Sequence, residues 1–337
     1  MRLGMNSQTI TGSVLILILL LLPLVLSSYL LHLAIMIMLL CYMGACWNII
    51  GGYGGQTLLC QGVFYAIGAY TSSLLLVRLG INPWIGMLLG AILSSIFGFL
   101  LGFLFFKYNL KTHYFAVGTL ALGEVVRTIF SNWDFVESTK GIIIPIRGDS
   151  FYYFQFGGKV PYYYIILVFT AMIIFVSDQI NRRKLGIYLR AIREEEMGAD
   201  SLGINRTYYK TAACVVTAFF TALAGSFTAQ YFLYIHPEQY VSLNLSIEAL
   251  CAAVAGGRGT VFGPILGGLI FGGVAEAARV YVGATYVGSH LIVNGLVLIG
   301  IIIYLPRGVL PVVVTAVDYF LKRTKNEKGA EREYGTA

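Results

Sequence analysis

The hydrophobic pattern of this chain consists of long apolar runs separated by shorter polar or glycine-rich segments. A helix needs about 20 apolar residues to cross the hydrocarbon core of a membrane. The pattern therefore predicts an all-α fold, a polytopic transmembrane helical bundle of about ten spans with two glycine-broken segments. The first and the eighth runs are short for a span. The predicted spans are residues 13–28, 31–50, 62–79, 84–106, 114–130, 162–179, 209–234, 245–255, 264–282 and 290–305.

The composition indicates an integral membrane protein. Of the 337 residues, 58% are hydrophobic and only 12% are charged, whereas soluble domains carry about 25% charged residues. So few charges could not cover a large soluble core. The net charge of +7 does not indicate nucleic-acid binding, because the basic residues lie in loops and at the tail and form no basic face with aromatic platforms. We expect a lipid bilayer around the chain and no nucleic acid.

Lysine and arginine are concentrated in two polar segments. Residues 181–210 carry seven and the segment from Arg307 onward carries six, whereas residues 131–161 carry three, offset by three acids. Because cytoplasmic loops are enriched in these residues, 181–210 and the tail are predicted to be cytoplasmic and 131–161 external. Ten crossings satisfy this alternation with both termini in the cytoplasm. The expected organisation is a multi-pass transmembrane domain at 1–310 in the cell (inner, or cytoplasmic) membrane and a basic cytoplasmic tail at 311–337.

Residues 181–210 form the longest strongly charged segment inside the chain. One interpretation is an ordinary positive-inside loop with a solvated helix. The other is a docking loop for a soluble cytoplasmic partner. Charge alone leaves both open.

Two glycine-rich stretches, 51–57 and 256–260, lie between apolar runs. Irregular backbone at membrane depth must line a cavity or be buried in protein, and broken helices often form transporter pathways. The alternative is a pair of plain interfacial turns. The candidate pathway-lining residues are Gly52, Gly54, Gly55, Gln56, Gln61, Gly256, Gly257 and Gly259.

Many other glycines are four residues apart, such as Gly86 with Gly90 and Gly98 with Gly102. This spacing lets the backbones of neighbouring helices approach closely in lipid. It predicts tight helix packing and no chemistry.

Charged residues inside predicted spans are costly and usually have a purpose. Glu124 with Arg127 and Glu276 with Arg279 are three apart, so each pair can meet on one helix face. They are either self-neutralised interfacial pairs or a charged rim at an external mouth. Glu248 stands alone in the eighth run, as a buried structural carboxylate or facing an external vestibule.

Several functional signatures are absent from the sequence. There is no Gly-x-x-x-x-Gly-Lys-Ser/Thr phosphate loop, no Gly-x-Ser-x-Gly and no His-Glu-x-x-His. The five cysteines and four histidines have no metal-ligand spacing. We expect no enzyme activity, no metal site and no cofactor.

Four motifs carry a family resemblance. The first runs Gly52-Tyr53-Gly54-Gly55-Gln56 and continues through 62–70; the others are 114–121 with Glu124 and Arg127, 186–205, and 256–264. Together they resemble permease subunits of branched-chain amino acid ABC importers, most closely the M-type of the two paired permeases, over residues 31–310. The chain has Leu58-Leu59-Cys60-Gln61-Gly62 where family members commonly have Ser-Leu-Gly-His-Gly. That departure puts the identity of the solute in question.

The resemblance implies a multi-subunit assembly. A second homologous permease subunit would complete the pore, ABC ATP-binding subunits would drive it, and an external solute-binding protein would deliver the solute. In that family the ATPases grip a cytoplasmic loop helix, which favours the docking interpretation of 181–210. The implied coupling residues are Leu189, Arg190, Arg193, Glu194, Glu195, Glu196, Gly198, Ala199, Asp200 and Gly203.

The expected function is that of a membrane-spanning permease subunit of an ATP-driven importer for branched-chain amino acids (Leu, Ile and Val). A permease for urea or short amides is the alternative within the class. A stand-alone secondary transporter would need its own ion or proton relay, and only Glu248 lacks an obvious charge partner nearby in sequence. A receptor or scaffold would have no need of the glycine breaks.

Overall fold

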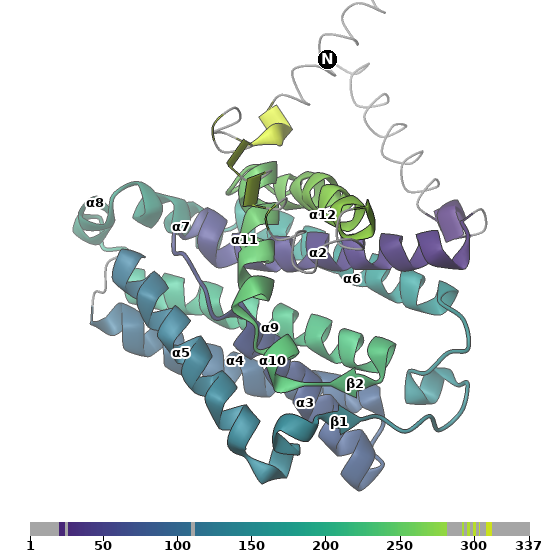
Figure 1. Ribbon diagram of the computed structural model, residues 1–337. Coiled ribbons are helices and arrows are strands. Elements are labelled where there is room, and N and C mark those ends of the chain that lie inside the picture. The colour runs from purple at the N-terminus through teal and green to yellow at the C-terminus, as the bar shows by residue number, and fades with distance from the viewer. Residues whose placement is uncertain are drawn as a thin grey trace, which may run out of the picture.

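The computed structural model describes residues 20–23, 26–108 and 112–281, with isolated positions between 292 and 303 and the stretch 308–311. These residues are almost entirely helical, apart from one short pair of strands. The strands are β1 (Ile142–Ile143) and β2 (Tyr234–Ile235). The helices are α2 (Ser28–Asn48), which continues into a π-helical turn (Ile49–Tyr53), α3 (Gln61–Leu79), α4 (Pro83–Lys107), α5 (Thr112–Asn132), α6 (Val160–Arg182), α7 (Lys184–Glu194), α8 (Glu196–Ser201), α9 (Arg206–Phe232), α10 (Pro237–Tyr240), α11 (Leu243–Gly256) and α12 (Gly263–Tyr281) (Figure 1).

Six helical segments of the described chain are long and apolar enough to cross a membrane. They match the second to seventh predicted spans, so the prediction of an all-α polytopic fold is confirmed. The eighth run is α11, which has 14 residues, and the apolar part of α12 is also shorter than a full span. The first and tenth runs lie mostly outside the described residues, so the count of ten remains a prediction. The six segments are Ser28–Tyr53, Gln61–Leu79, Pro83–Lys107, Thr112–Asn132, Val160–Arg182 and Arg206–Phe232.

Local sequence signals explain where the helices end. Helix α3 stops at Gly80, whose φ of 66° is the left-handed conformation that glycine adopts without strain. Two residues later the Asn82 side chain accepts a hydrogen bond from the Trp84 amide, and Pro83 occupies the first turn of α4. This short connection makes α3 and α4 antiparallel neighbours.

Helices α3, α4 and α9 pack against one another through small residues. A Cβ on Gly86 would lie 2.9 Å from the Ser72 Cα, and one on Gly98 would lie 2.7 Å from the Ala218 Cβ. The Ser94 hydroxyl donates to the Ala218 carbonyl at 3.0 Å across the same contact. The tight packing predicted from glycine spacing is therefore confirmed for α4.

The outer face of α4 is apolar and uncovered by the described residues. Leu88, Ile92, Ile96 and Leu100 are each at least half exposed. An exposed patch of this size would be a liability in water. It is the ordinary surface of a helix that faces lipid.

The loops gather at two opposite ends of the bundle. At one end, β1 from segment 131–161 pairs antiparallel with β2, and Arg147 and the Phe151 carbonyl bind the ends of α3 and α4. At the other end lie α7, α8 and the connections from α2 to α3 and from α11 to α12 (Figure 1). Segments 131–161 and 181–210 therefore lie at opposite ends, as the predicted alternation requires.

Candidate functional site: the loop 181–210 and the glycine junction

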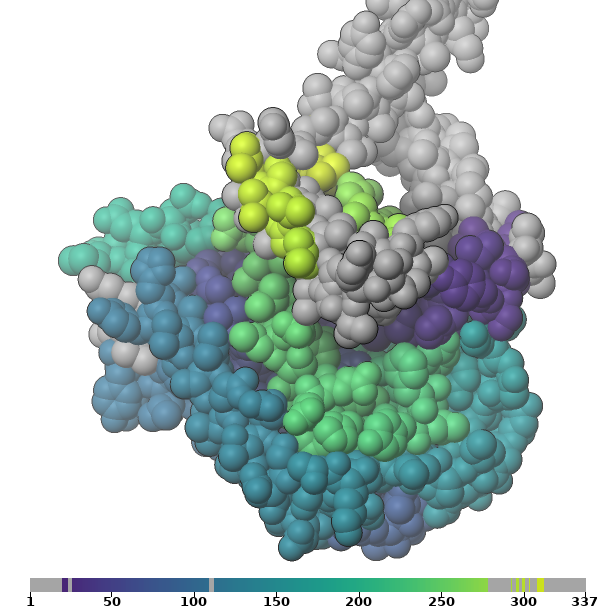
Figure 2. Space-filling model, viewed as in Figure 1, coloured from purple at the N-terminus to yellow at the C-terminus, as the bar shows by residue number. Residues whose placement is uncertain are grey.

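The loop predicted to be cytoplasmic folds into two helices. Glu195 has an extended backbone (φ −154°) that separates α7 from α8. Gly203 has φ 79°, and the Asn205 side chain then accepts from the Tyr208 amide to begin α9. The turn after α8 therefore depends on a glycine and a capping asparagine. In Figure 2 the region around α8 projects from the edge of the molecule.

Salt bridges hold α8 against the start of α9. Lys210 is buried and binds Glu196. Arg206 bridges to Asp200 at 3.0 Å and to Glu196 at 3.4 Å. Because these groups are only partly exposed, they fix the position of α8 more firmly than isolated surface pairs would.

The predicted coupling charges divide between inward and outward directions. Arg190 donates to the Asn181 side chain at 2.8 Å, and Arg193 donates to the Gly52 carbonyl at 2.8 Å. The side chain of Glu194 is 74% exposed, and Glu195 is exposed as well. Arg193 also forms an ion pair with Glu194 at 2.9 Å. The two acids are nevertheless exposed to a partner, whereas the two arginines are engaged within the chain.

Three apolar side chains of the loop are exposed as well. Met197 and Leu202 are about four-fifths exposed, and Ile187 is half exposed. Leu189, Ile192 and Ala199 instead point inward and are buried. The exposed apolar residues belong to the same short helices and turns as Glu194 and Glu195, and we name these five residues the loop surface. Its three apolar members are not among the residues predicted from the sequence.

The two glycine stretches meet at one place, against α7. The buried Asn48 side chain donates to the Thr260 carbonyl at 2.9 Å and accepts from the Gly259 amide at 2.8 Å. The Arg193 guanidinium reaches the Gly52 carbonyl beside them. We name this contact the glycine junction; its members are Asn48, Gly52, Gly55, Arg193, Gly259 and Thr260.

The other predicted pathway residues near the junction are enclosed in protein. Gln61 is buried and donates to the Met43 carbonyl at 3.0 Å and to the Thr221 hydroxyl at 3.3 Å. Gln56 and Gly54 are buried or nearly so. Gly256 packs directly on the backbone of Gly263. None of these four predicted residues borders either of the two cavities described next.

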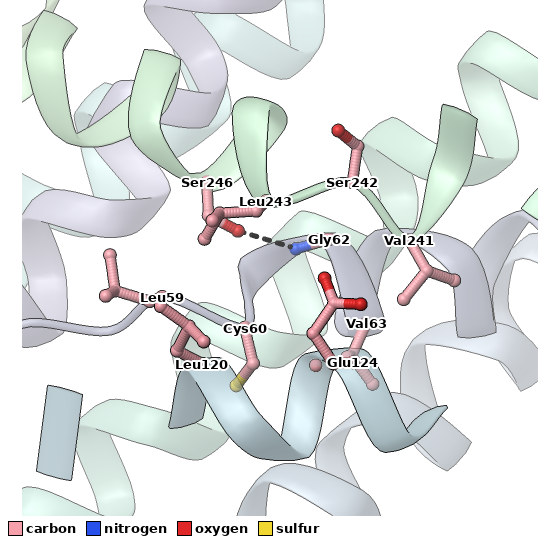
Figure 3. A pocket seen from close by; sticks show the side chains of 11 residues that line it. Leu59, Cys60, Gly62, Val63, Leu120, Glu124, Val241, Ser242, Leu243 and Ser246 are labelled. Carbon is pink, nitrogen blue, oxygen red and sulfur yellow. Dashed lines mark hydrogen bonds between the residues drawn. The ribbon is translucent and has the colours of Figure 1, made fainter. Parts of the chain in front are cut away.

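A small cavity lies where α5 meets the starts of α3 and α11. It holds about 10 Å³, room for roughly one water molecule. Figure 3 shows Glu124 pointing toward Gly62 and Val63, with the Ser246 hydroxyl bonded to the Gly62 amide at 3.1 Å. Glu124 also pairs with Arg127 at 2.6 Å, and both side chains are partly exposed. The predicted pairing of these two charges on one helix face is confirmed.

A larger cavity of about 320 Å³ lies between α2, α10, α11 and α12. Its lining combines apolar groups, such as Met36 and Phe271, with the polar residues Tyr65, Glu248 and Glu276. We name it the amphipathic cavity. Its volume lies within the range of small-ligand sites, and no Lys, Arg or His is among its described lining residues. The side chain of Arg279, the predicted partner of Glu276, lies outside the described residues.

No group of three or more His, Cys, Asp or Glu side chains suited to a metal ion occurs within the described residues. The five cysteines are free thiols, and all are buried.

Comparison with known proteins identifies relatives over most of the chain. A family model described as "Branched-chain amino acid transport system / permease component" matches residues 29–305. The high-affinity branched-chain amino acid transport system permease protein LivM of Salmonella typhimurium is 30% identical over 271 residues, covering 74% of this chain and 63% of that protein. The LivH protein of the same organism is 36% identical over 112 residues, covering 33% of this chain and 35% of LivH.

The chain spans 63% of the length of the LivM protein it matches. Among solved structures, PsaBC from Streptococcus pneumoniae in complex with Fab aligns over 84% of this chain and 94% of the other, with a TM-score of 0.46 and 14% identity. A likeness at that level carries no argument about the fold.

Proposed function

This chain belongs to the family described as the branched-chain amino acid transport system permease component, and on that premise we propose that it is a membrane-spanning permease subunit of an ATP-driven importer of leucine, isoleucine and valine. The family match over residues 29–305 is the observation that carries the proposal. The six long apolar helices agree with it. In this proposal the nucleotide sites lie on the partner subunits, and this chain forms part of the pathway and responds to its partners.

The proposed partners are a second homologous permease, ATP-binding subunits and an external solute-binding protein. This chain resembles LivM over most of its length and LivH over a shorter stretch. Similarity to two permeases that are named as parts of branched-chain amino acid systems supports pairing with a related subunit. In this proposal residues 1–310 form the permease domain and 311–337 a cytoplasmic tail.

We propose the loop surface as the docking site for an ATP-binding subunit. Exposed Met197 and Leu202 beside exposed carboxylates form a mixed apolar and acidic patch. Buried apolar anchors with a charged rim are characteristic of protein interfaces. The salt bridges of Lys210 and Arg206 would keep the patch rigid, so that it transmits a displacement caused by the partner without deforming.

The solute pathway is proposed to pass the amphipathic cavity. The carboxylates of Glu248 and Glu276 among the described lining residues carry the charge that attracts an ammonium group, and the apolar wall suits an aliphatic side chain. Glu124 and Arg127 are proposed as a charged rim toward the external end. The glycine stretches would then act at the cytoplasmic end of the pathway.

Reconstitution of the native assembly tests this proposal. The tagged chain is purified in mild detergent, its companions are identified by mass, and the assembly is placed in liposomes with radiolabelled leucine. We expect an ATP-binding protein and a second permease to copurify, and leucine uptake to require ATP hydrolysis.

Two outcomes would overturn it. Uptake by this chain alone without ATP would indicate a stand-alone transporter. ATP-dependent uptake of urea or acetamide, with no uptake of leucine, would replace the solute class.

A further inference from the structure

We propose that Arg193 and Asn48 are positioning residues that link α7 mechanically to α2 and to the turn between α11 and α12. The inference rests on the proposed function, because it concerns how movement of the loop reaches the pathway. It assigns to Arg193 a role inside the chain, distinct from pairing with a partner's charges.

The chain makes room for the Arg193 side chain with two glycines. A Cβ on Gly55 would lie 2.5 Å from the Arg193 Cγ, and a Cβ on Gly259 would lie 2.8 Å from its Nη1. Both glycines have positive φ, 68° and 76°, which other residues rarely adopt. Arg193 therefore passes between the two glycine stretches, and each stretch is shaped to admit it.

The hydrogen bond at the end of the Arg193 side chain gives a partner to a carbonyl at the end of a helix. Gly52 lies in the π-helical turn Ile49–Tyr53 at the C-terminal end of α2, where helix carbonyls lack partners within the helix. The Arg193 guanidinium donates to the Gly52 carbonyl at 2.8 Å. A hydrogen bond from a charged donor is stronger than a neutral one. π-Helical turns are frequent at functional sites, and this one contains the carbonyl that Arg193 binds.

Asn48 ties the same end of α2 to the turn that follows α11. Its carboxamide accepts from the Gly259 amide and donates to the Thr260 carbonyl. The side chain is 1% exposed. Breaking either bond would leave a buried polar group without a partner, which is costly. Asn48 therefore holds α2 and the α11–α12 turn in one geometry.

Beyond the junction, α2, α11 and α12 touch backbone to backbone. A Cβ on Gly44 would lie 2.9 Å from the Ala252 Cβ, and one on Gly268 would lie 2.7 Å from the Cys41 sulfur. Gly267 leaves no room for a side chain against the Ala252 carbonyl. With so little flexible side chain between them, the three helices must move together, because packed interiors transmit displacement.

These three helices also form most of the amphipathic cavity. Leu40 belongs to α2, Glu248 to α11 and Phe271 to α12, and all three line it. A displacement of α7 therefore reaches the cavity walls through Arg193 and Asn48. In this scheme the glycine junction is the rigid link between the loop surface and the pathway.

The test uses the complete reconstituted importer and measures leucine uptake and ATP hydrolysis in the same liposomes. We expect Arg193→Ala to lower the leucine transported per ATP by about tenfold or more, within the usual range of coupling between sites. ATP hydrolysis should stay within about twofold of the unmodified protein, because Arg193→Ala changes no residue of the loop surface and removes only one exposed ion pair, with Glu194. Arg193→Lys, which keeps one charged donor, should restore part of the ratio.

A second variant changes another residue of the glycine junction, and two further variants serve as controls. Gly259→Ala should reproduce the Arg193→Ala defect, because its Cβ displaces the guanidinium. Gly80→Ala is the matched control, with φ 66° at the opposite end of the bundle. Arg182→Ala removes an exposed arginine of the same loop, which forms a salt bridge with Asp178 on α6. Both controls should leave the ratio unchanged.

The outcomes separate this inference from the proposed function. ATP-driven leucine uptake by the unmodified assembly supports the function independently of any variant. An unchanged transport ratio in Arg193→Ala and Gly259→Ala would overturn the link. So would parallel loss of ATP hydrolysis and uptake with loss of the ATP-binding subunit, which would place Arg193 in docking.

Discussion

At the scale of single residues, the structure distinguishes charged side chains that are exposed from charged side chains that bind other groups of the chain. Arg193 and Glu194 are adjacent and form an ion pair at 2.9 Å, yet Arg193 also reaches the Gly52 carbonyl, whereas Glu194 is mostly exposed. The pattern of an amphipathic helix predicts which residues are polar on its surface. It does not predict whether a long side chain turns back into the protein.

Glu248 offers the residue-scale prediction for solute recognition. Glu248→Gln should lower leucine uptake by the assembled importer by about tenfold or more. The substitution removes the attraction between the carboxylate and the ammonium group of the solute, which contributes several kcal/mol in a low-dielectric site. The measurement is initial uptake rate, together with competition by 3-methylbutylamine and by 4-methylpentanoate. The amine keeps the ammonium group and should compete better than the acid.

Glu137→Gln is the control for this prediction, since Glu137 is exposed in the segment 131–161. Uptake by Glu248→Gln equal to that of the control, or stronger competition by 4-methylpentanoate, would contradict a carboxylate role in the cavity.

At the scale of elements, glycine decides how closely helices approach. Gly225 on α9 faces the Tyr65 carbonyl of α3 with no space for a side chain, and Gly68 on α3 faces the backbone of Ala222 in the same way. In a membrane, where burial of apolar surface drives helix association only weakly, such contacts supply much of the packing energy.

Gly225→Ala should therefore destabilise the protein by about 3 kcal/mol, the upper part of the range for overpacked cores, because the obstruction is backbone. Gly273→Ala makes the same change at a helical glycine whose Cβ would meet no atom within 4 Å. The thermal midpoint of the purified protein in detergent should fall for the first variant and hold for the second. Equal midpoints would show that α3 and α9 can separate at little cost.

At the scale of the whole molecule, the sequence predicted the fold better than the site. Apolar runs of span length gave six helices with nearly the observed bounds, because lipid requires that pattern of any spanning helix. The glycine stretches were visible as breaks. Their meeting was not, since Asn48 and Gly259 are 211 residues apart and a single asparagine in an apolar run carries no signal of its partner. Met197 and Leu202 were missed because the sequence does not show whether an apolar residue in a loop is covered by the protein or exposed.

The sidedness of the bundle is also a whole-molecule prediction. Because the native cysteines are buried, new cysteines at exposed Thr139 and Ser201 should report their own side. A membrane-impermeant maleimide added to intact cells should label Thr139→Cys and spare Ser201→Cys until the membrane is permeabilised. The reverse pattern would invert the orientation derived from Lys and Arg.

Helix α5 has a consequence for how cells manage this protein. Only 17% of the most apolar stretch of α5 is buried, compared with 72% of that of α9. Helix α5 also carries the partly exposed Glu124 and Arg127. A partly exposed charged pair in a spanning helix is costly in lipid, so we expect a copy inserted with nothing over α5 to present a feature by which membrane quality control can recognise an orphan subunit. We then expect synthesis of this chain to keep pace with that of the subunit that covers α5, and excess copies to be degraded. Gene dosage is thereby tied to the exposure of one helix.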